Sequence, residues 1–116
     1  MTDKGGSGAK ALKRHWFHIL LALADEARHG YAIREDARRR TDGAVELYPA
    51  TLYGSIRDLT DQGLIEPLEG EDDPDDDQRR QYYRLTEAGR DVLRDEVARL
   101  QGILDDARAT RVFGGA

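Results

Sequence analysis

Several small and polar residues in the segment 49–62 could bind double-stranded DNA. If this segment is a helix, Leu52, Ile56 and Leu59 form its buried row. The opposite face would then present Ala50, Thr51, Tyr53, Gly54 and Arg57. Small residues would let the helix lie deep in the major groove, where Arg57 could donate two parallel hydrogen bonds to a guanine edge or one to a phosphate.

Each side chain on this face has an alternative role. Thr51 could bond a phosphate near the start of the helix, and Tyr53 could reach the DNA backbone or a thymine methyl group. Tyr53 could instead be partly buried in the core, and Arg57 could form an ion pair with Asp58 or Asp61. The pattern favours DNA contact for Arg57 and leaves Tyr53 open.

Two further groups of residues could contact the DNA backbone. His29, Gly30 and Tyr31 stand where a helix would begin, so backbone N–H groups and a phenol could bind phosphate there. His29 could instead cap that helix while Tyr31 packs inward. Arg79 and Arg80 could lie in a minor groove, or they could neutralise the acids at 75–77.

Catalytic and metal-binding patterns are missing from the sequence. It has no cysteine, which excludes a thiolate nucleophile, a disulfide and any zinc site with a cysteine ligand. Neither a G-x-S-x-G motif nor a glycine-rich strand-to-helix turn occurs. His15 and His18 are spaced like metal ligands, but no third ligand is nearby. We therefore expect no enzyme activity, no cofactor and no metal.

Charge and hydropathy limit the location and the partners of the protein. The formal charge of the 116 residues is −5, but without the seven acids of the segment 69–77 it would be +2. These acids lack the spacing of a calcium-binding loop, so we expect a solvated loop that would weaken non-specific DNA binding. No apolar run approaches the ~18 residues that cross a bilayer, which predicts a cytoplasmic protein without a membrane partner.

The order of expected elements indicates a winged helix-turn-helix. Apolar spacing predicts helices over 12–27, 31–40 and 49–62, then strands at 64–68 and 81–85 joined as a hairpin. Residues 45–47 are expected to be an edge strand or an extended linker. Tyr31, Ile33 and Ala37 are expected to point inward, and Thr86 is expected to cap a last helix that runs to about 110. The expected fold is mainly α with a small β-hairpin: a flexible tail over 1–10, a DNA-binding domain over 11–86, a C-terminal dimerisation helix over 87–110 and a tail over 111–116.

The last helix carries an apolar stripe that one chain cannot bury alone. Leu93, Val97, Leu100 and Leu104 recur at spacings of 4, 3 and 4, as in a coiled-coil seam. We expect a homodimer in which Trp16 faces the last helix of the partner. Two-fold symmetry predicts a pseudo-palindromic operator with half-sites about 10 bp apart or a multiple of that distance. Trp16 and Phe17 could also stack a small planar effector, although such residues are more often interface core.

Three strings in this order resemble the PadR family of transcriptional regulators: HILLALADEARHGYAI (18–33), LYPATLYGSIRDLTDQGLIE (47–66) and RRQYYRLTEAGRDVL (79–93). The single helix after the wing is similar to the compact PadR subfamily. The resemblance implies a homodimeric DNA-binding repressor whose last helix supplies much of the dimer contact and helps to shape an effector pocket. Two departures are Tyr48, which replaces the usual small polar residue before Pro49, and the acidic wing segment.

Two functions follow from these observations. The first is a sequence-specific regulator, a repressor that acts as a homodimer and is released from DNA by an effector. The alternative is a winged-helix protein-interaction module without specific DNA binding, which the net negative charge favours because the usual basic footprint is missing.

Overall fold

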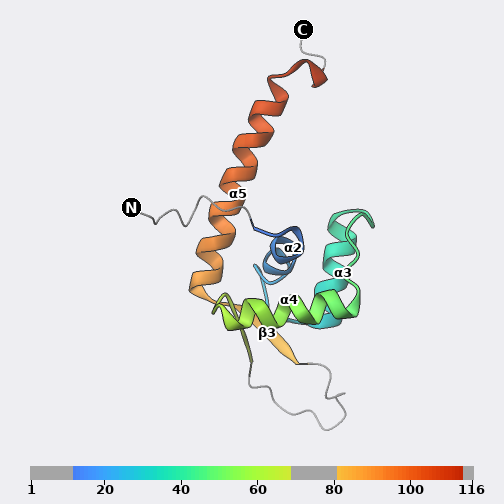
Figure 1. Ribbon diagram of the computed structural model, residues 1–116, viewed down its shortest axis with the longest axis vertical. Coiled ribbons are helices and arrows are strands. Elements are labelled where there is room, and N and C mark those ends of the chain that lie inside the picture. The colour runs from blue at the N-terminus through green and yellow to red at the C-terminus, as the bar shows by residue number, and fades with distance from the viewer. Residues whose placement is uncertain (1–11, 69–80, 114–116) are drawn as a thin grey trace.

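The computed structural model describes residues 12–68 and 81–113 (Figure 1). This part of the chain is mostly helical with a small antiparallel sheet, as the sequence predicted. Its elements are α2 (Arg14–Ala22), β1 (Arg28–His29), α3 (Gly30–Arg40), α4 (Pro49–Asp61), β2 (Ile65–Pro67), β3 (Tyr82–Leu85), α5 (Glu87–Arg108) and a short 3-10 helix η1 (Arg111–Phe113).

The core lies where α2, α3 and α4 meet. Ile19 and Leu20 of α2, Ile33 of α3 and Leu59 of α4 are fully buried there. Leu52 and Ile56 are also buried, which confirms the predicted inward row of α4. Because this row takes one face of α4, the opposite face is free to meet a ligand.

The first helix is shorter than predicted. It ends at Ala22 instead of about residue 27, because the N–H groups of Leu23 and Ala24 bond to carbonyls only three residues back and close the last turn. The chain then enters β1, whose two residues are too short to show an alternating pattern. Ending the helix here makes the turn from α2 into the sheet possible.

The wing is a three-stranded sheet, not the two-stranded hairpin that the sequence predicted. Its strand order is β1-β3-β2, with both pairs antiparallel. In the hairpin, Ile65 pairs with Leu85, and Arg84 donates to the Glu66 carboxylate at 2.6 Å across the strands. On the other edge, His29 pairs with Tyr82. The added strand links the start of α3 directly to the wing.

Residues 42–48 connect α3 to α4 without forming a strand. Asp42 and Gly43 adopt left-handed backbone angles, with φ of 55° and 86°, and the Gly43 N–H donates to the Arg38 carbonyl at 2.8 Å. This geometry is a typical end for a helix. Of the two expected alternatives for 45–47, the extended linker is correct, and the buried side chains of Val45 and Leu47 fix it to the core.

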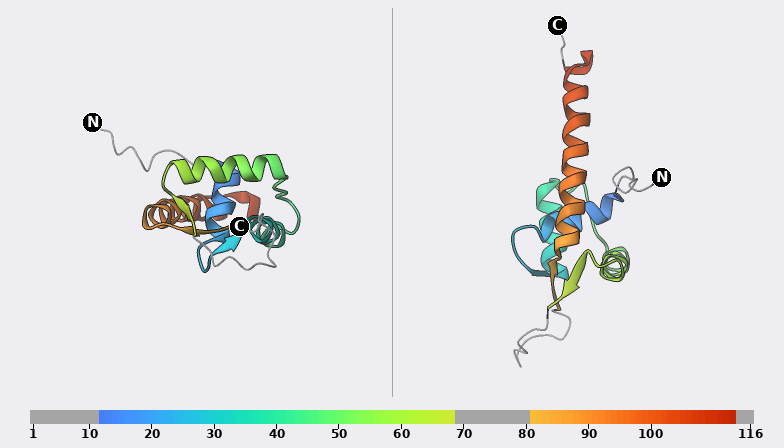
Figure 2. Two further views of the ribbon diagram at one scale, coloured as in Figure 1. Left: turned by 90° about the horizontal axis from the view of Figure 1, so that it is seen from below. Right: turned by 90° about the vertical axis from the view of Figure 1, so that its left-hand side faces the viewer.

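The long helix α5 begins as the sequence predicted. The Thr86 hydroxyl accepts a hydrogen bond from the Gly89 N–H at 3.0 Å, which caps the first turn. The first half of α5 packs on the body of the molecule, and the second half projects beyond it (Figures 1 and 2). The expected tail over 1–10 lies outside the described residues, and the expected tail over 111–116 begins with η1.

Candidate nucleic-acid interface

One face of α4 is open at the end of the molecule opposite the free half of α5. In Figure 1, α4 crosses the lower part of the molecule near β3, while α5 begins at the lower left and runs to the top. Ala50, Thr51 and Arg57 are exposed, Gly54 is half-buried, and 43% of Tyr53 is exposed. The structure thus brings together on one face the five residues that the sequence placed there.

Arg57 is available to a ligand. Within the part of the chain that the structure describes, no carboxylate forms an ion pair with it, so the expected alternatives Asp58 and Asp61 are not its partners. By contrast, each of the other six arginines of β1, α3 and β3 has a carboxylate within 4.0 Å: Arg28, Arg34, Arg38, Arg39, Arg40 and Arg84. Arg57 is therefore exposed and has no carboxylate partner among the described residues.

The start of α3 carries the second predicted group. His29 occupies the N-cap position, and its Nδ1 accepts from the Ala32 N–H at 3.2 Å, so the capping alternative is confirmed. Tyr31 does not pack inward as predicted: 62% of it is exposed. Its ring lies nearly parallel to that of His29, with centroids 6.4 Å apart and planes at 25°. The Tyr82 ring of β3 makes an edge contact with the His29 ring, with the ring centroids 5.2 Å apart.

Tyr53 joins α4 to α3. A Cβ atom placed on Gly30 would lie 2.5 Å from the Tyr53 hydroxyl, so the phenol occupies the space that a side chain at this position would need. Burial raises the pKa of the Tyr83 phenol, and the nearby Tyr53 raises it further. Tyr53 is thus partly packed and partly exposed, so the expected alternative of partial burial is correct, and its contact with DNA stays a prediction.

The first turn of α4 has no side-chain cap. Tyr48 takes the N-cap position with an extended backbone, but its side chain makes no capping hydrogen bond, as the sequence predicted. Pro49 follows at the first helical position, where its missing N–H costs nothing. The Tyr48 ring itself is 64% exposed, which the sequence analysis did not anticipate.

Arg79, Arg80 and the acidic segment lie outside the described residues. Their predicted contact with DNA therefore stays a prediction.

Comparisons with known proteins agree with this geometry. The model described as "Transcriptional regulator PadR-like family" matches residues 19–95. The chain belongs to the PadR-like family of transcriptional regulators. This is a family of regulators and not of enzymes, which agrees with the lack of a catalytic motif in the sequence.

Individual relatives are similar to this chain in sequence or in fold. A protein of Lysinibacillus sphaericus called uncharacterized protein X is 32% identical over 90 residues, which are 75% of this chain and 81% of that protein. A transcriptional regulator from Clostridium thermocellum superposes with a TM-score of 0.67 at 26% identity, covering 81% of this chain and 86% of the other. Bacillus subtilis PadR in complex with operator DNA gives a TM-score of 0.63 at 21% identity, covering 73% of this chain and 47% of the other, so it shows the fold alone.

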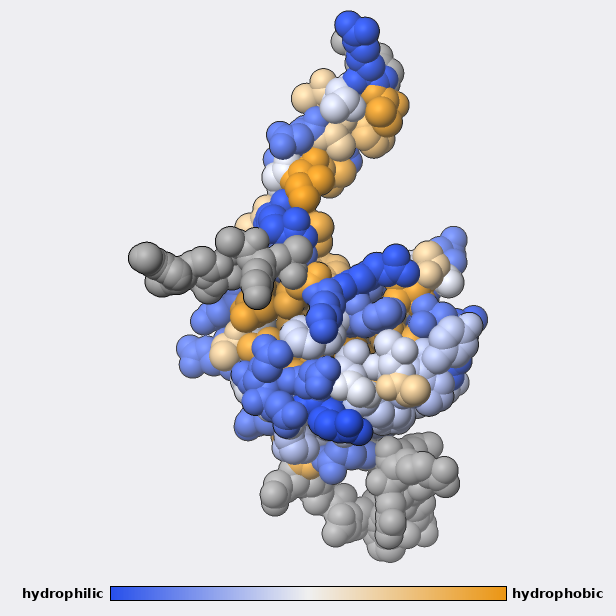
Figure 3. Space-filling view, viewed as in Figure 1, coloured by the Kyte–Doolittle hydropathy of each residue, from blue (hydrophilic) through white to orange (hydrophobic). Residues whose placement is uncertain are grey.

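In this PadR-like chain the predicted dimerisation stripe divides into two parts. Leu93 is buried in the core of its own chain, so it offers little surface to a partner. Val97, Leu100 and Leu104 are exposed on the free half of α5, together with Ile103. Figure 3 shows apolar side chains along this half and at its junction with the body. The stripe therefore has an intramolecular start and an uncovered continuation.

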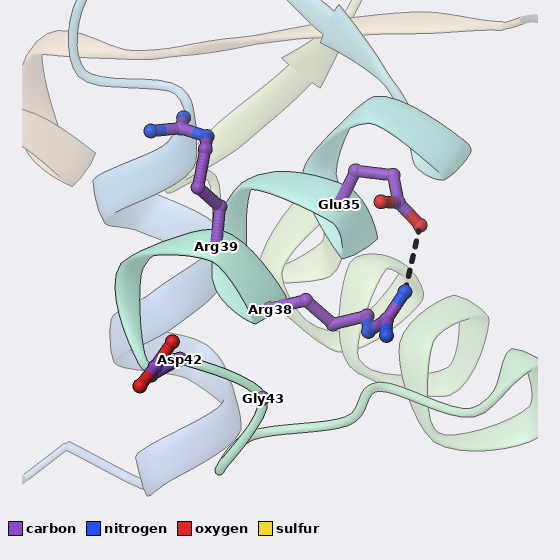
Figure 4. Close-up of a pocket in the computed structure, with 5 residues that line it drawn as sticks. All are labelled: Glu35, Arg38, Arg39, Asp42 and Gly43. Atoms are coloured by element: carbon purple, nitrogen blue, oxygen red, sulfur yellow. Dashed lines mark ion pairs between the residues drawn. The ribbon is translucent and has the colours of Figure 1, made fainter.

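The predicted effector residues are partly occupied by packing. Trp16 and Phe17 are half-buried against the core, and the Lys13 ammonium lies 4.9 Å from the centre of the Trp16 ring. A described pocket lies elsewhere, at the end of α3, with walls formed by Glu35, Arg38, Arg39, Asp42 and Gly43 (Figure 4). Its charged walls do not suit a planar apolar ligand, so this pocket gives no support to the effector prediction.

The sequence analysis missed the residue that anchors α3. Asp36 is almost completely buried and forms ion pairs with Arg40 at 2.6 Å, with Arg28 of β1 at 3.9 Å and with Arg39. A buried carboxylate needs such partners to stay charged. Only the i, i+3 and i, i+4 spacing of Asp36 with Arg39 and Arg40 could have indicated part of this cluster.

Two expected absences can be checked over the described ranges. Neither 12–68 nor 81–113 contains a helix that is long and apolar enough to span a bilayer. No group of three potential metal ligands occurs in the same ranges.

Proposed function

We propose that this chain is a sequence-specific DNA-binding repressor that acts as a homodimer. The observation that carries the proposal is the open face of α4, where small residues surround an arginine without a carboxylate partner. Such a face fits a major groove, and a guanidinium there can donate to a guanine edge. Thr51 and Tyr31 are exposed and would supply hydroxyl groups for phosphate.

The dimer in this proposal rests on the free half of α5. Val97, Leu100 and Leu104 would be covered by a second copy, since an exposed apolar stripe of this kind is typical of a coiled-coil seam. Two-fold symmetry would then set two copies of α4 against successive major grooves. The operator would be pseudo-palindromic, with half-sites about 10 bp apart or a multiple of that distance.

Effector release in this proposal rests on the two aromatic residues of α2. A planar ligand would stack on Trp16 and Phe17 where α2 meets the second copy. Tryptophan fluorescence reports on this place directly, because Trp16 is the only tryptophan in the sequence.

The rival function is a protein-interaction module, and one observation favours it. Six of the seven described arginines from β1 to β3 form ion pairs with carboxylates, which leaves little of the basic footprint that DNA-binding proteins usually carry.

Selection of DNA fragments by the purified protein separates the two functions. The repressor proposal predicts that selected fragments converge on an inverted repeat and that the protein retards them in a gel in competition with unrelated DNA. An interaction module would select no common sequence and give no retarded band at any salt concentration.

A further inference from the structure

The end of the molecule that carries α4 is rich in exposed tyrosine. The sequence has five tyrosines, and four of them have exposed side chains: Tyr31 (62%), Tyr48 (64%), Tyr53 (43%) and Tyr82 (38%). A phenol presents an apolar ring and one strong hydrogen-bonding group, and burying such a group requires a partner. Four exposed phenols on a small domain therefore point to a ligand that offers hydrogen-bond acceptors.

These tyrosines lie on neighbouring elements. Tyr31 and Tyr82 both contact the His29 ring. The Tyr53 hydroxyl lies against Gly30, the residue before Tyr31. Tyr48 directly precedes α4. The start of α3, the helix α4 and the strand β3 all lie at the end of the molecule away from the free half of α5 (Figures 1 and 2).

The same end is poor in available positive charge. Among the arginines of β1, α3, α4 and β3, which are all described, Arg57 alone has no carboxylate partner. The segment 69–80, which lies outside the described residues, adds seven acids and only two arginines to the sequence between β2 and β3. Few cationic side chains are therefore available to form ion pairs with DNA phosphates.

We propose that this face holds DNA phosphates mainly through tyrosine hydroxyls, so that operator affinity depends only weakly on salt. The inference rests on the proposed DNA-binding function. A phenol donates its O–H to a phosphate oxygen without adding positive charge, so it displaces no condensed counterion. A cation that neutralises a phosphate does displace one, and each such contact adds about 0.9 to the slope of log affinity against log salt.

The wild-type protein gives the first test. Arg57 from each protomer contributes a slope of about −2 in a dimer, and the predicted DNA contact of one of Arg79 and Arg80 from each protomer would contribute about as much again. We expect the magnitude of the measured slope to stay below about 4. Proteins that bind phosphates mainly through ion pairs have slopes of magnitude about 6 or more. A slope of larger magnitude than about 4 overturns the proposal.

Conservative variants give the second test, on an operator obtained by selection. Tyr31→Phe and Tyr82→Phe keep the rings and remove the hydroxyls. We expect each to weaken binding about five-fold per lost phosphate bond, and so about 25-fold for a dimer that loses two, with the salt slope unchanged. Arg57→Ala should instead reduce the magnitude of the slope by about 2.

Tyr83→Phe is the matched control. This residue is adjacent to Tyr82 but is half-buried, so loss of its hydroxyl should leave operator affinity at the wild-type value. If the Tyr31 and Tyr82 variants also bind like the wild type, phenols do not hold the phosphates and the inference is wrong, although DNA binding itself stands. If the wild-type protein binds no selected DNA at any salt concentration, the proposed function fails and this inference fails with it.

Discussion

The hydroxyl of Tyr53 in α4 lies against the first residue of α3, Gly30, at a distance that leaves no room for a Cβ atom. The two residues belong to different sequence motifs, HGY and TLYG. Their contact sets α4 and the start of α3 side by side at one end of the molecule, where the candidate DNA contacts lie. The glycine is needed there because of a neighbouring side chain, since its own backbone angles are not in the left-handed region.

Gly30→Ala is expected to lower operator affinity and to change the free energy of unfolding only a little. The new methyl group would force the Tyr53 ring aside, but the ring is partly exposed and can move, so we expect a loss of no more than about 1 kcal/mol in the free energy of unfolding. Fluorescence anisotropy with labelled operator and urea unfolding measure the two effects. Unchanged affinity would show that the position of Tyr53 does not matter for DNA binding.

Gly89→Ala is expected to destabilise the fold itself. A Cβ atom at this position would lie 2.0 Å from the Leu64 carbonyl oxygen, a backbone atom that also accepts a hydrogen bond from the Thr86 N–H at 3.1 Å. Neither side can give way easily, so we expect a loss of about 1–3 kcal/mol in urea unfolding.

Gly102→Ala is the control for this substitution, because a Cβ atom there meets nothing within 4 Å. It should gain up to about 1 kcal/mol from the better helix propensity of alanine. Equal unfolding free energies for the two variants would contradict the close contact between α5 and the start of β2.

Arg57→Ala is expected to cost about 1–3 kcal/mol of specific binding and to leave the dimer intact. The reason is the loss of a guanidinium that reads a base edge or a phosphate from the open face of α4. Arg94→Ala is a suitable control, since Arg94 lies on α5 and pairs with Asp91 at 3.1 Å. If both variants bind the operator like the wild type, Arg57 does not take part in reading it.

Leu100→Asp is expected to dissociate the dimer without unfolding the chain. Leu100 is exposed on the free half of α5, so a charge there would have to be buried only on association. Light scattering should give the monomer mass for this variant and the dimer mass for Ala98→Asp, which changes an exposed residue outside the stripe. Leu93→Asp should unfold the protein instead, because Leu93 lies in the core.

Stability is expected to fall on the acid side because of His18. Burial lowers the pKa of its imidazole, the positive charges of Arg14, His15 and Arg40 lower it further, and Asp36 raises it. The unfolded chain therefore binds the proton more readily. The resulting loss of stability begins as the pH falls below the ordinary value of 6.5 and is complete below the lowered pKa.

Urea unfolding at pH values on both sides of 6.5 measures this contribution. His18→Gln should flatten the pH dependence across this window, whereas His15→Gln should reduce it only in part, because His15 is one of several groups that lower the His18 pKa. The Nδ1 atom of His18 is buried without a hydrogen-bond partner in the described structure, so removal of the imidazole breaks no bond at that atom. An identical pH dependence for all three proteins would refute the assignment.

Long periodic segments made most of the fold predictable. The apolar rows of α4 and α5 recur over several turns, so their buried faces and the Thr86 cap could be located from the sequence. β1 could not be found, because two residues carry no period. The early end of α2 was missed because apolar spacing does not reveal the backbone hydrogen bonds that close its last turn. The inward position expected for Tyr31 was wrong. Helical spacing alone does not show that the Tyr31 ring lies beside the ring of the N-cap residue His29 and outside the core.

The candidate site was predictable to a similar extent. Helical spacing alone placed five residues on the open face of α4. It could not show that Arg57 has no carboxylate partner among the described residues while Arg34 and Arg84 have one, because the partners Glu46 and Glu66 come from other elements. The exposure of Tyr48 and Tyr82 also depends on tertiary packing, which a single sequence does not reveal.

The direct junction of β1 with α3 has a mechanical consequence. β1 ends at His29 and α3 begins at Gly30, with no intervening loop. Because β1 is hydrogen-bonded to β3, a tilt of the wing must rotate the first turn of α3 with it. In the proposed DNA complex, a duplex whose groove width displaces the wing would therefore also shift the phenol of Tyr31. The wing and the start of α3 would then respond to the shape of the DNA together and not independently.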